Sequence, residues 1–417
     1  MDLQDQLQQL RRRIARIDRK YAGATTRPQS PAPERRLPER YSIEHWLSGQ
    51  EVETPHGRHF ETERVWERHR RHGSIGISDL SDLPPDLFDE LTGRAVDPAA
   101  PRHWAFLDTE TTGLAGGSGT YAFLIGVGRI TAEGFHLRQF FMRDYAEEAS
   151  LLFALERYLS EFSVLVTYNG RAYDQPLLET RYRMSRRRAP FDRMGHVDLL
   201  YGARRLWKLQ FESCRLVDLE NQVLGVERDG DLPGEMIPYV YFEYLRRREA
   251  FRVAPIFHHN AIDILTLACL CAIVPWAFRS PAEARLRRGP EMVGIGRWLR
   301  KCGRMEDALL LFRRAVDAGL PDDLLFRTLW EVAQLERKLG RMDAAVAVLT
   351  ELSACRNPFR VAALEDLAKY YEHRERNYTM ALEMTRAALA CEDSNPLRHR
   401  EQRLARRLAV PRNRRLL

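Results

Sequence analysis

The chain lacks any Cys-x-x-Cys pair. Its six cysteines are Cys214, Cys269, Cys271, Cys302, Cys355 and Cys391. A structural zinc site is therefore not expected, because such sites are usually built from closely spaced cysteine pairs. Two of the cysteines lie in "LTLACLCAIV", an apolar run typical of a helix. We expect reduced, buried cysteines in a cytoplasmic protein.

The sequence also lacks an apolar run that approaches the ~20 residues needed to cross a membrane. Its N-terminus, "MDLQDQLQQLRRR", has no apolar core of the kind found in secretory signals. Asp2 and Asp5 in this stretch argue against an acid-poor transit peptide. We therefore expect a soluble, cytoplasmic protein with no membrane partner.

Positively charged residues outnumber negatively charged ones. Lys and Arg number 65 against 58 Asp and Glu, which gives a formal net charge of +7. A basic balance fits a polyanionic partner, and it fits equally well a protein that uses arginine for solubility. The length of 417 residues and the 44% of hydrophobic residues allow two or three domains with sizeable cores.

Patterns along the sequence divide the chain into five segments. We predict an N-terminal amphipathic helix and linker over 1–40, a small extension with a hairpin over 41–99, an α/β domain over 100–280, helical repeats over 290–395 and a basic tail over 396–417. The apolar seam of the first segment would form a short coiled coil or a helix docked on its own chain. The tail would bind a nucleic-acid backbone or form a solvated helix, and the residues favour neither.

The segment 41–99 contains "GQEVETPHGRHFETERVW". Its alternating pattern around Pro-His-Gly predicts a β-hairpin. His56 and His59 lie at this turn. They could bind a metal, although solvated turn histidines are far more common.

The segment 100–280 alternates apolar runs typical of strands with stretches typical of helices. The runs are "HWAFLDTE", "TYAFLIGVGRI", "FHLRQFFM" and "VLVTYN". The short turn "TTGLAGGSG" joins the first two, so they should pair as an antiparallel hairpin. The predicted fold class is therefore an α/β mixed sheet with flanking helices, not a fully parallel sheet.

The C-terminal part is predicted to be an all-α domain of helical hairpins. Ala308, Ala345 and Ala381 occupy the same place in three similar units, 37 and then 36 residues apart. A small residue at a fixed place lets paired helices approach closely. The pattern resembles tetratricopeptide repeats. Such an array would offer a concave face to a protein partner or would serve packing alone.

Two acids close the first apolar run of the α/β segment. Asp108 and Glu110 are two positions apart, so on a strand both side chains leave the same face. Buried, unpaired carboxylates carry a large free-energy cost or become protonated. A cation would remove that cost, and ligands that are all oxygen suit Mg²⁺ or Mn²⁺. The alternative is that one acid caps a helix and the other pairs with arginine.

Further acids follow in order along the chain. "VTYNGRAYD" ends an apolar run and leads into a helix, which places Asp174 near a strand end. "FHHNAIDILTLACL" places Asp263 on a helix. His259 precedes Asp263 by four residues and shares its helix face, and His258 precedes it by five. Taken singly, Asp174 could be a helix N-cap and Asp263 a surface acid.

Taken together, these residues resemble the DEDD superfamily of 3′–5′ exonucleases, which have a ribonuclease H-like fold. "LDTETTGL" matches the first motif, Asp-x-Glu; "NGRAYD" matches the second, Asn-x-x-x-Tyr-Asp; and "HHNAID" matches the third, His or Tyr followed by Asp. Within the superfamily the chain is most similar to the YprB-type ribonuclease H-like proteins, through "GGSGTY", "HVDLLYGAR", "DLPGEMIP" and "EVETPHGRHF". The likeness covers roughly residues 40–280.

The resemblance implies a metal-dependent exonuclease that acts on a single-stranded 3′ end of DNA or RNA. It implies two divalent ions, Mg²⁺ or Mn²⁺, held by Asp108, Glu110, Asp174 and Asp263. A histidine would act as general base toward the attacking water. The "HN" of the YprB-type pattern favours His259, and His258 is the alternative.

Other residues near the motifs would support this site. By resemblance, Asn169 is expected to order the loop of the second motif and Tyr173 to pack under it. Asp198 in "HVDLL" is expected to cap a helix, with a role at the metals as the alternative. The competing interpretation of the whole chain is a nucleic-acid-binding or scaffolding protein with a weak or idle nuclease site.

Overall fold

The computed structural model describes residues 41–93, 96–113, 119–282, 286 and 288–409. The seam and linker predicted over 1–40, the centre of the glycine-rich turn and the end of the basic tail lie outside the described residues. The chain forms two compact units. Unit 1 comprises Met1–Gly202 and Cys214–Pro275, and unit 2 comprises Ala203–Ser213 and Trp276–Leu417.

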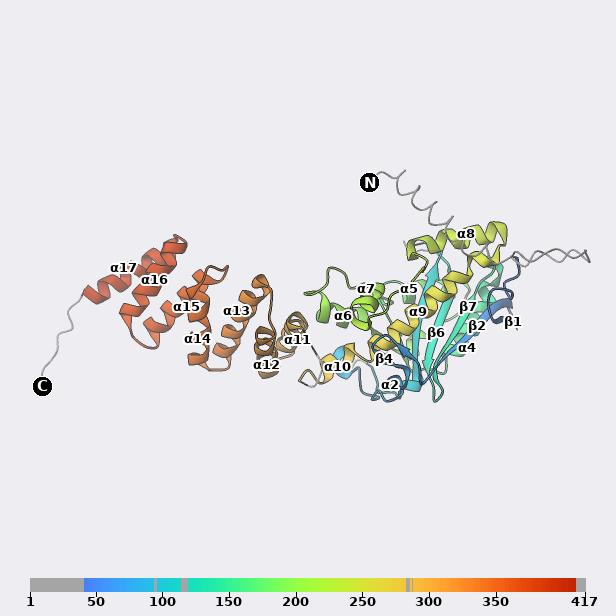
Figure 1. The fold of residues 1–417 in the computed structure, drawn as a ribbon, viewed down its shortest axis with the longest axis horizontal. Helices are drawn as coiled ribbons and strands as arrows, with labels where there is room; N and C mark the ends of the chain where they lie inside the picture. Colours follow the sequence, from blue (N-terminus) through green and yellow to red (C-terminus); the bar gives the residue numbers. More distant parts are fainter. Residues whose placement is uncertain (1–40, 94–95, 114–118, 283–285, 287, 410–417) are drawn as a thin grey trace, which may run out of the picture. The chain divides into compact units, whose positions relative to one another are not determined.

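Unit 1 is built on a seven-stranded mixed sheet (Figure 1). In spatial order its strands are β1 (Gly49–Thr54), β2 (Gly57–Glu67), β7 (Gly134–Phe141), β6 (Ala122–Ile130), β5 (Trp104–Thr111), β8 (Val164–Thr167) and β9 (Gly195–Asp198). Neighbours pair antiparallel from β1 to β5, whereas β5, β8 and β9 pair in parallel. The predicted mixed sheet is therefore confirmed.

Two of the antiparallel hairpins in this sheet were predicted from the sequence. Strands β5 and β6 pair as the sequence predicts, with Asp108 opposite Gly126. Strands β1 and β2 form the other hairpin, and because β2 pairs with β7, this hairpin extends the main sheet. A separate two-stranded ribbon is formed by β3 (Arg71–His72) and β4 (Ile75–Gly76).

The histidines of the first hairpin differ from each other. His56 is exposed, as expected of a turn. The prediction of a solvated turn residue is wrong for His59, which is fully buried. Its Nδ1 lies 2.9 Å from Ser150 Oγ and its Nε2 lies 2.8 Å from Glu61 Oε1. The reason is that alternate residues of β2 point toward α4 (Glu148–Leu159), which packs on β1, β2 and β7.

The helix that carries the third motif, α9 (Ala254–Cys271), lies against β5, β6 and β7 and is drawn in yellow in Figure 1. Gly126 and Gly128 allow this close approach. A Cβ on Gly126 would lie 2.2 Å from Ile264 Cδ1, and a Cβ on Gly128 would lie 2.8 Å from Ile264 Cγ2. The glycines of "LIGVGRI" therefore set the separation between the sheet and α9.

Helix α9 also belongs to the span Ala250–Arg279, which is long and apolar enough to cross a membrane by length and composition alone. However, 72% of its most apolar window is buried inside the protein, as in a core helix. The sequence analysis counted only uninterrupted apolar runs as candidates to cross a membrane. It therefore passed over this helix, in which a few polar residues interrupt the apolar ones.

Shorter helices complete unit 1. They are α2 (Ile77–Ser81), α3 (Asp89–Thr92), α5 (Asp174–Met184), α7 (Leu216–Leu219) and α8 (Ile237–Arg247). The chain passes from one unit to the other within α6 (Leu199–Trp207) and α10 (Val274–Arg279).

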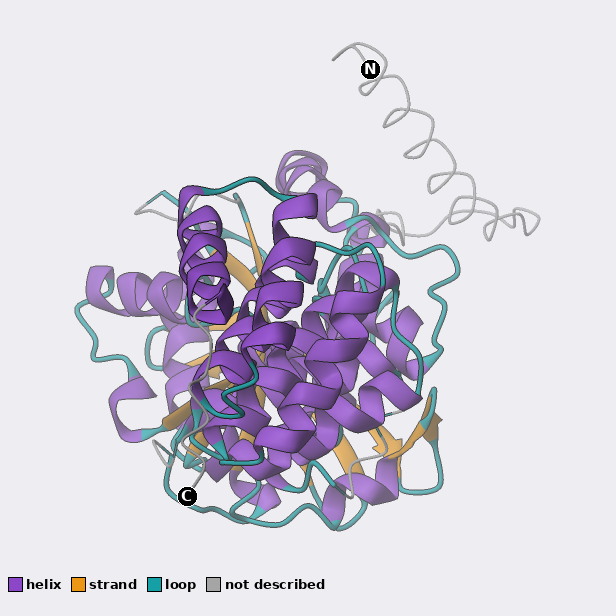
Figure 2. Ribbon diagram, turned by 90° about the vertical axis from the view of Figure 1, so that its left-hand side faces the viewer, coloured by secondary structure: helices purple, strands orange, loops and turns teal. Residues whose placement is uncertain are grey.

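Unit 2 consists of helices and loops in the part that the structure describes, so all the strands drawn in orange in Figure 2 belong to unit 1. Its helices are α11 (Gly289–Lys301), α12 (Met305–Asp317), α13 (Asp322–Lys338), α14 (Met342–Ala354), α15 (Arg360–His373), α16 (Tyr378–Cys391) and α17 (Asn395–Ala409). Helices α11 and α12, α13 and α14, and α15 and α16 pack as pairs. Ala308, Ala345 and Ala381 are buried in the second helix of each pair. The all-helical region is confirmed, and its tetratricopeptide character stays a prediction.

The basic tail begins as α17, which packs on α16. Leu397 and Leu404 are its buried residues. Arg400 and Arg403 form ion pairs with Glu372 of α15. Part of the positive charge of the tail is therefore matched within unit 2.

The cysteines are all free. Cys269 and Cys271 are buried in α9, as expected. Cys302, Cys355 and Cys391 are exposed, so the expectation of burial is wrong for them. Each of these three stands at the C-terminal end of a helix, where the side chain leaves the packed surface.

Candidate functional site

Four carboxyl groups from three parts of unit 1 lie close together beside β5. Asp108 and Glu110 belong to β5, Asp174 is the first residue of α5, and Asp263 lies in α9. Their charges act on one another, because Asp263, Glu110 and Asp174 each raise the pKa of Asp108. The structure thus brings together the four acids that the sequence singled out.

Burial and the neighbouring carboxylates disfavour the charged form of Asp108, Glu110 and Asp174. Burial, and then the neighbouring carboxylates, raise the pKa of Asp108 well above its usual range. Burial raises the pKa of Glu110 to about 8 against the opposing effect of His259. Burial also raises the pKa of Asp174 to about 6, although Thr109 Oγ1 donates to Asp174 Oδ1 at 2.6 Å. Such a set of oxygen atoms is costly to ionise without a cation and suits a hard divalent ion.

A chain of amide hydrogen bonds fixes Asp108. Asn260 Nδ2 donates to Asp108 Oδ2 at 2.9 Å and to Asp108 O at 3.3 Å. Gln139 Nε2 donates to Asn260 Oδ1 at 2.9 Å, and Thr62 Oγ1 donates to Gln139 Oε1 at 3.0 Å. Gly126, opposite Asp108, leaves room for this amide, because a Cβ there would lie 2.3 Å from Asn260 Oδ1. Of these partners, only Asn260 had a sequence signal, as the Asn of "HHNAID".

The loop of the second motif is held by Asp198. Its Oδ1 accepts from Asn169 N at 2.8 Å and from Leu200 N at 3.1 Å, and its Oδ2 accepts from Arg171 N at 3.1 Å. Asp198 is therefore the predicted cap at the start of α6, and it also braces the loop before α5. Asn169 has φ 67°, a left-handed conformation that asparagine tolerates in turns.

Tyr173 differs from its expectation. The side chain is 59% exposed and does not pack under the loop. Asp174 turns inward at the start of α5, and its neighbour consequently faces solvent. An exposed aromatic ring thus stands beside the carboxylates.

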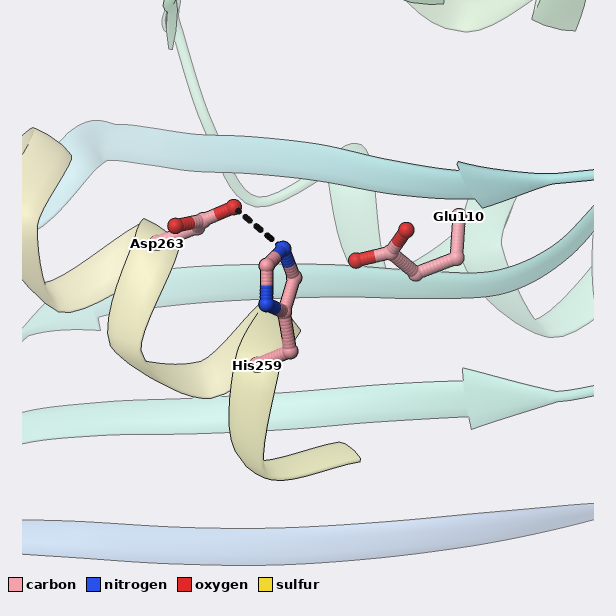
Figure 3. Close-up of side chains that lie close together, drawn as sticks. All are labelled: Glu110, His259 and Asp263. Atoms are coloured by element: carbon pink, nitrogen blue, oxygen red, sulfur yellow. Dashed lines mark ion pairs between the residues drawn. The ribbon is translucent and has the colours of Figure 1, made fainter. Parts of the chain in front are cut away.

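Of the two adjacent histidines, His259 faces the carboxylates (Figure 3). Its Nε2 lies 3.4 Å from Asp263 Oδ2, in agreement with the i, i+4 spacing. Glu110, His259 and Asp263 offer ligand atoms that all lie within 4.8 Å of one another, close enough to hold a metal ion. His258 is exposed.

A second layer of charged residues holds His259 and Asp263. His259 Nδ1 donates to Asp231 Oδ2 at 2.8 Å. Burial lowers the pKa of His259, but this hydrogen bond and the charges of Asp263 and Glu110 outweigh it and raise the pKa to about 9. Arg228 Nη2 donates to Asp263 Oδ1 at 2.5 Å, and Arg228 Nη1 lies 3.2 Å from Asp231 Oδ2.

Arg228 is buried with its partners. Its Nε donates to Glu220 Oε2 at 2.8 Å, and the side chains of Arg228 and Glu220 are 9% and 1% exposed. Burial alone would lower the pKa of Arg228. The carboxylates of Glu220 and Asp263 have the larger effect, and the pKa is raised above its usual range. The sequence did not identify Arg228, Asp231 or Glu220. The signal for Arg228 and Asp231 was the charged stretch "VERDGDLPGEM", and Glu220 lies outside it.

Comparisons with known proteins agree with this geometry. A family model described as the RNase_H superfamily matches residues 105–274, a span that contains the four acids and His259. The chain is 32% identical over 329 residues to the uncharacterized protein YprB of Bacillus subtilis (strain 168), a match that covers 77% of this chain and 78% of that protein.

Proposed function

The chain belongs to the YprB family within the ribonuclease H superfamily, and from this premise we propose that it is a divalent-metal-dependent 3′–5′ exonuclease acting on single strands. The superfamily domain supports a nuclease function on nucleic acids. The observation that carries the finer proposal is the meeting of Asp108, Glu110, Asp174 and Asp263, two of which, Glu110 and Asp263, lie beside His259.

The donor set fits the ions that such a reaction needs. The proposed ligands are the four carboxylates. The raised pKa values of Asp108, Glu110 and Asp174 support a site that a cation neutralises. Two Mg²⁺ or Mn²⁺ ions bound there would supply an activated water and stabilise the leaving 3′-oxygen.

His259 is the proposed general base. Asp231 accepts a hydrogen bond from Nδ1–H, which keeps the proton of the neutral ring on Nδ1. The lone pair of Nε2 would then point toward the carboxylates. Nε2 is then placed to take a proton from a water that attacks the terminal phosphodiester. The charges of Asp263 and Glu110 help to keep the ring protonated, and a cation that neutralises them removes that cause.

The proposed function is tested by end-labelled single strands of DNA and RNA incubated with the full chain. We expect stepwise release of nucleotides from the 3′ end with Mg²⁺ or Mn²⁺. Chelation of the metal should stop the reaction, and added metal should restore it. Strands carrying the label at the 5′ end should shorten as a ladder. If the strands are cut only at internal positions, the protein is an endonuclease and not an exonuclease. If no strand is cleaved, the proposal is refuted.

The placement of His259 gives a sharper test. Asp231→Asn should lower kcat about 10–100-fold, because a neutral amide accepts more weakly from Nδ1–H and can instead donate to Nδ1, which favours the wrong tautomer. KM should change little, since the partners of Asp231 are His259 and Arg228. The matched variant is His258→Gln, an exposed neighbour, which should keep its activity. A large loss in His258→Gln together with a mild effect of Asp231→Asn would transfer the role of base to His258.

One contact favours the competing function, a nucleic-acid-binding or scaffolding protein with an idle site. Arg228 occupies Asp263 Oδ1, which removes one oxygen from a proposed metal ligand. Calorimetric titration with Mn²⁺ separates the two functions. An active site should bind Mn²⁺ in the wild-type chain and lose that binding in Asp174→Ala, whereas an idle site should show no such difference. A protein partner on the helical repeats of unit 2 stays a prediction.

A further inference from the structure

Helix α8 is fixed to unit 1 by one side. Ile237, Tyr241 and Tyr244 are buried on that side. The ring of Tyr241 stacks on Phe123 with ring centroids 3.8 Å apart, and its hydroxyl donates to Met142 O at 2.8 Å. The helix therefore has a defined orientation, and its remaining side is presented to solvent.

The outward side of α8 carries large aromatic residues. Tyr239 is 48% exposed and Phe242 is 39% exposed. Arg246 follows four residues after Phe242, and its side chain is also exposed. Spacings of three and four residues place these side chains along one stripe of the helix. We call Tyr239, Phe242 and Arg246 the outer stripe.

The segment that leads into α8 borders the candidate site. Residues 231–236 lead from Asp231, which holds His259, directly into α8. Gly234 borders the proposed base, because a Cβ on Gly234 would lie 4.0 Å from His259 Nε2 and nothing nearer would meet it. The chain at Gly234 therefore passes close to His259 Nε2 and then continues as the helix that carries the outer stripe.

The dimensions suit stacked bases. Tyr239 and Phe242 are separated by about 4.5 Å along the helix axis, at ~1.5 Å per residue. Successive stacked bases are about 3.4 Å apart. Exposed aromatic rings with this spacing are the platforms on which single strands stack, without regard to sequence.

The charge at the far end of the stripe suits phosphates. Arg246 and Arg247 share one carboxylate, Glu243, at 3.2 Å and 3.1 Å. One positive charge therefore remains in excess. Arg248 pairs with Asp144 and adds no net charge. An apolar partner would not need this excess, whereas a polyanionic strand would.

We propose that the outer stripe of α8 binds the single strand whose 3′ end enters the site, with bases stacked on Tyr239 and Phe242 and a phosphate at Arg246. This binding surface rests on the proposed function for its direction, since the strand would run from Arg246 toward His259. It adds a strand-binding track, which neither the motifs nor the comparisons assign.

The track is tested by binding without catalysis. Fluorescence anisotropy would follow labelled oligodeoxythymidylate and oligouridylate of about 12 nucleotides with the full chain in EDTA. The double variant Tyr239→Ser/Phe242→Ser should weaken binding about tenfold for each ring lost. Leu310→Ser, which changes an equally exposed apolar residue of unit 2, is the matched control and should bind as wild type. Melting curves should coincide, because all three side chains are exposed.

A second variant tests the phosphate contact. Arg246→Gln leaves Arg247 to pair with Glu243, and it should reduce the slope of log Kd against log salt by about one. Wild-type affinity in the double variant would refute the track. The track would also be refuted if the double variant bound strands as wild type but was cleaved more by trypsin within residues 1–40. In that case α8 would cover a segment of its own chain. Failure of the wild-type chain to trim any strand would defeat the exonuclease proposal alone, since binding is measured in EDTA.

Discussion

Replacing Glu110 by glutamine is expected to abolish 3′ trimming and, at the same time, to stabilise the metal-free protein. The activity should fall by at least ~10³-fold, because a neutral amide no longer helps to hold the cations that neutralise the reaction's charge. The stability should change in the opposite direction. The carboxyl of Glu110 is buried among Asp263, Asp174 and Asp231, and it is costly to ionise there.

The sign follows from the pKa. Burial raises the pKa of Glu110 from its ordinary value of 4.5 to about 8 in the folded chain. The folded state therefore holds its proton more tightly than the unfolded state, and stability falls as pH rises from about 4.5 through about 8. The full cost above that range is roughly 4–5 kcal/mol at most. Glutamine carries no such cost, so its advantage should be present at pH 9 and absent at pH 4.

The measurement is urea unfolding in EDTA at these two pH values. Glu133→Gln, at an exposed side chain, is the matched control and should behave as wild type at both. Mn²⁺ should stabilise the wild-type chain at high pH and should stabilise Glu110→Gln much less. A variant that trims strands, or that is less stable than wild type at pH 9, would show that Glu110 is not a ligand held for a cation.

The sequence predicted those features of the site that depend on local spacing. Asp108 and Glu110 share a face because side chains alternate along a strand. His259 and Asp263 meet because residues four apart share a helix face. The mixed sheet followed from a turn too short for anything but an antiparallel hairpin.

The sequence did not predict contacts between residues that are distant along the chain. Asn260 reaches Asp108 only because Gly126, on another strand, has no side chain. Nothing in the pattern near either residue reveals this fit. The burial of His59 likewise depends on α4, which follows about ninety residues later. Tertiary packing determines both the Asn260–Asp108 contact and the burial of His59. The local sequence pattern carries no information about such packing.

Removal of Arg228 should strongly destabilise the metal-free chain. Its guanidinium contacts Glu220, Asp231 and Asp263. Arg228→Met should lower the free energy of unfolding in EDTA by about 3–5 kcal/mol, because it leaves buried carboxylates without a counter-charge. Arg188→Met is the matched control. Arg188 forms an exposed ion pair with Asp192, and its loss should cost less than about 1 kcal/mol.

Two further variants identify the cause. Arg228→Lys should fall between wild type and Arg228→Met, because a compact ammonium cannot span three carboxylates as a planar guanidinium does. Adding Glu220→Gln to Arg228→Met should restore part of the loss, since it removes one uncompensated charge. A loss below about 1 kcal/mol in Arg228→Met would mean that these carboxylates do not depend on the arginine for their stability.

The same variant decides what Arg228 does to the proposed metals. Arg228 occupies one oxygen of Asp263, so it either competes with a cation for that carboxylate or orients the other oxygen toward one. Competition predicts tighter Mn²⁺ binding in Arg228→Met, and orientation predicts weaker binding. We expect weaker binding, because Asp263 Oδ2 is the atom that faces His259 and only Oδ1 is held by the arginine. Calorimetry with the full chain measures the sign directly, and tighter binding would make Arg228 an internal rival of the metal.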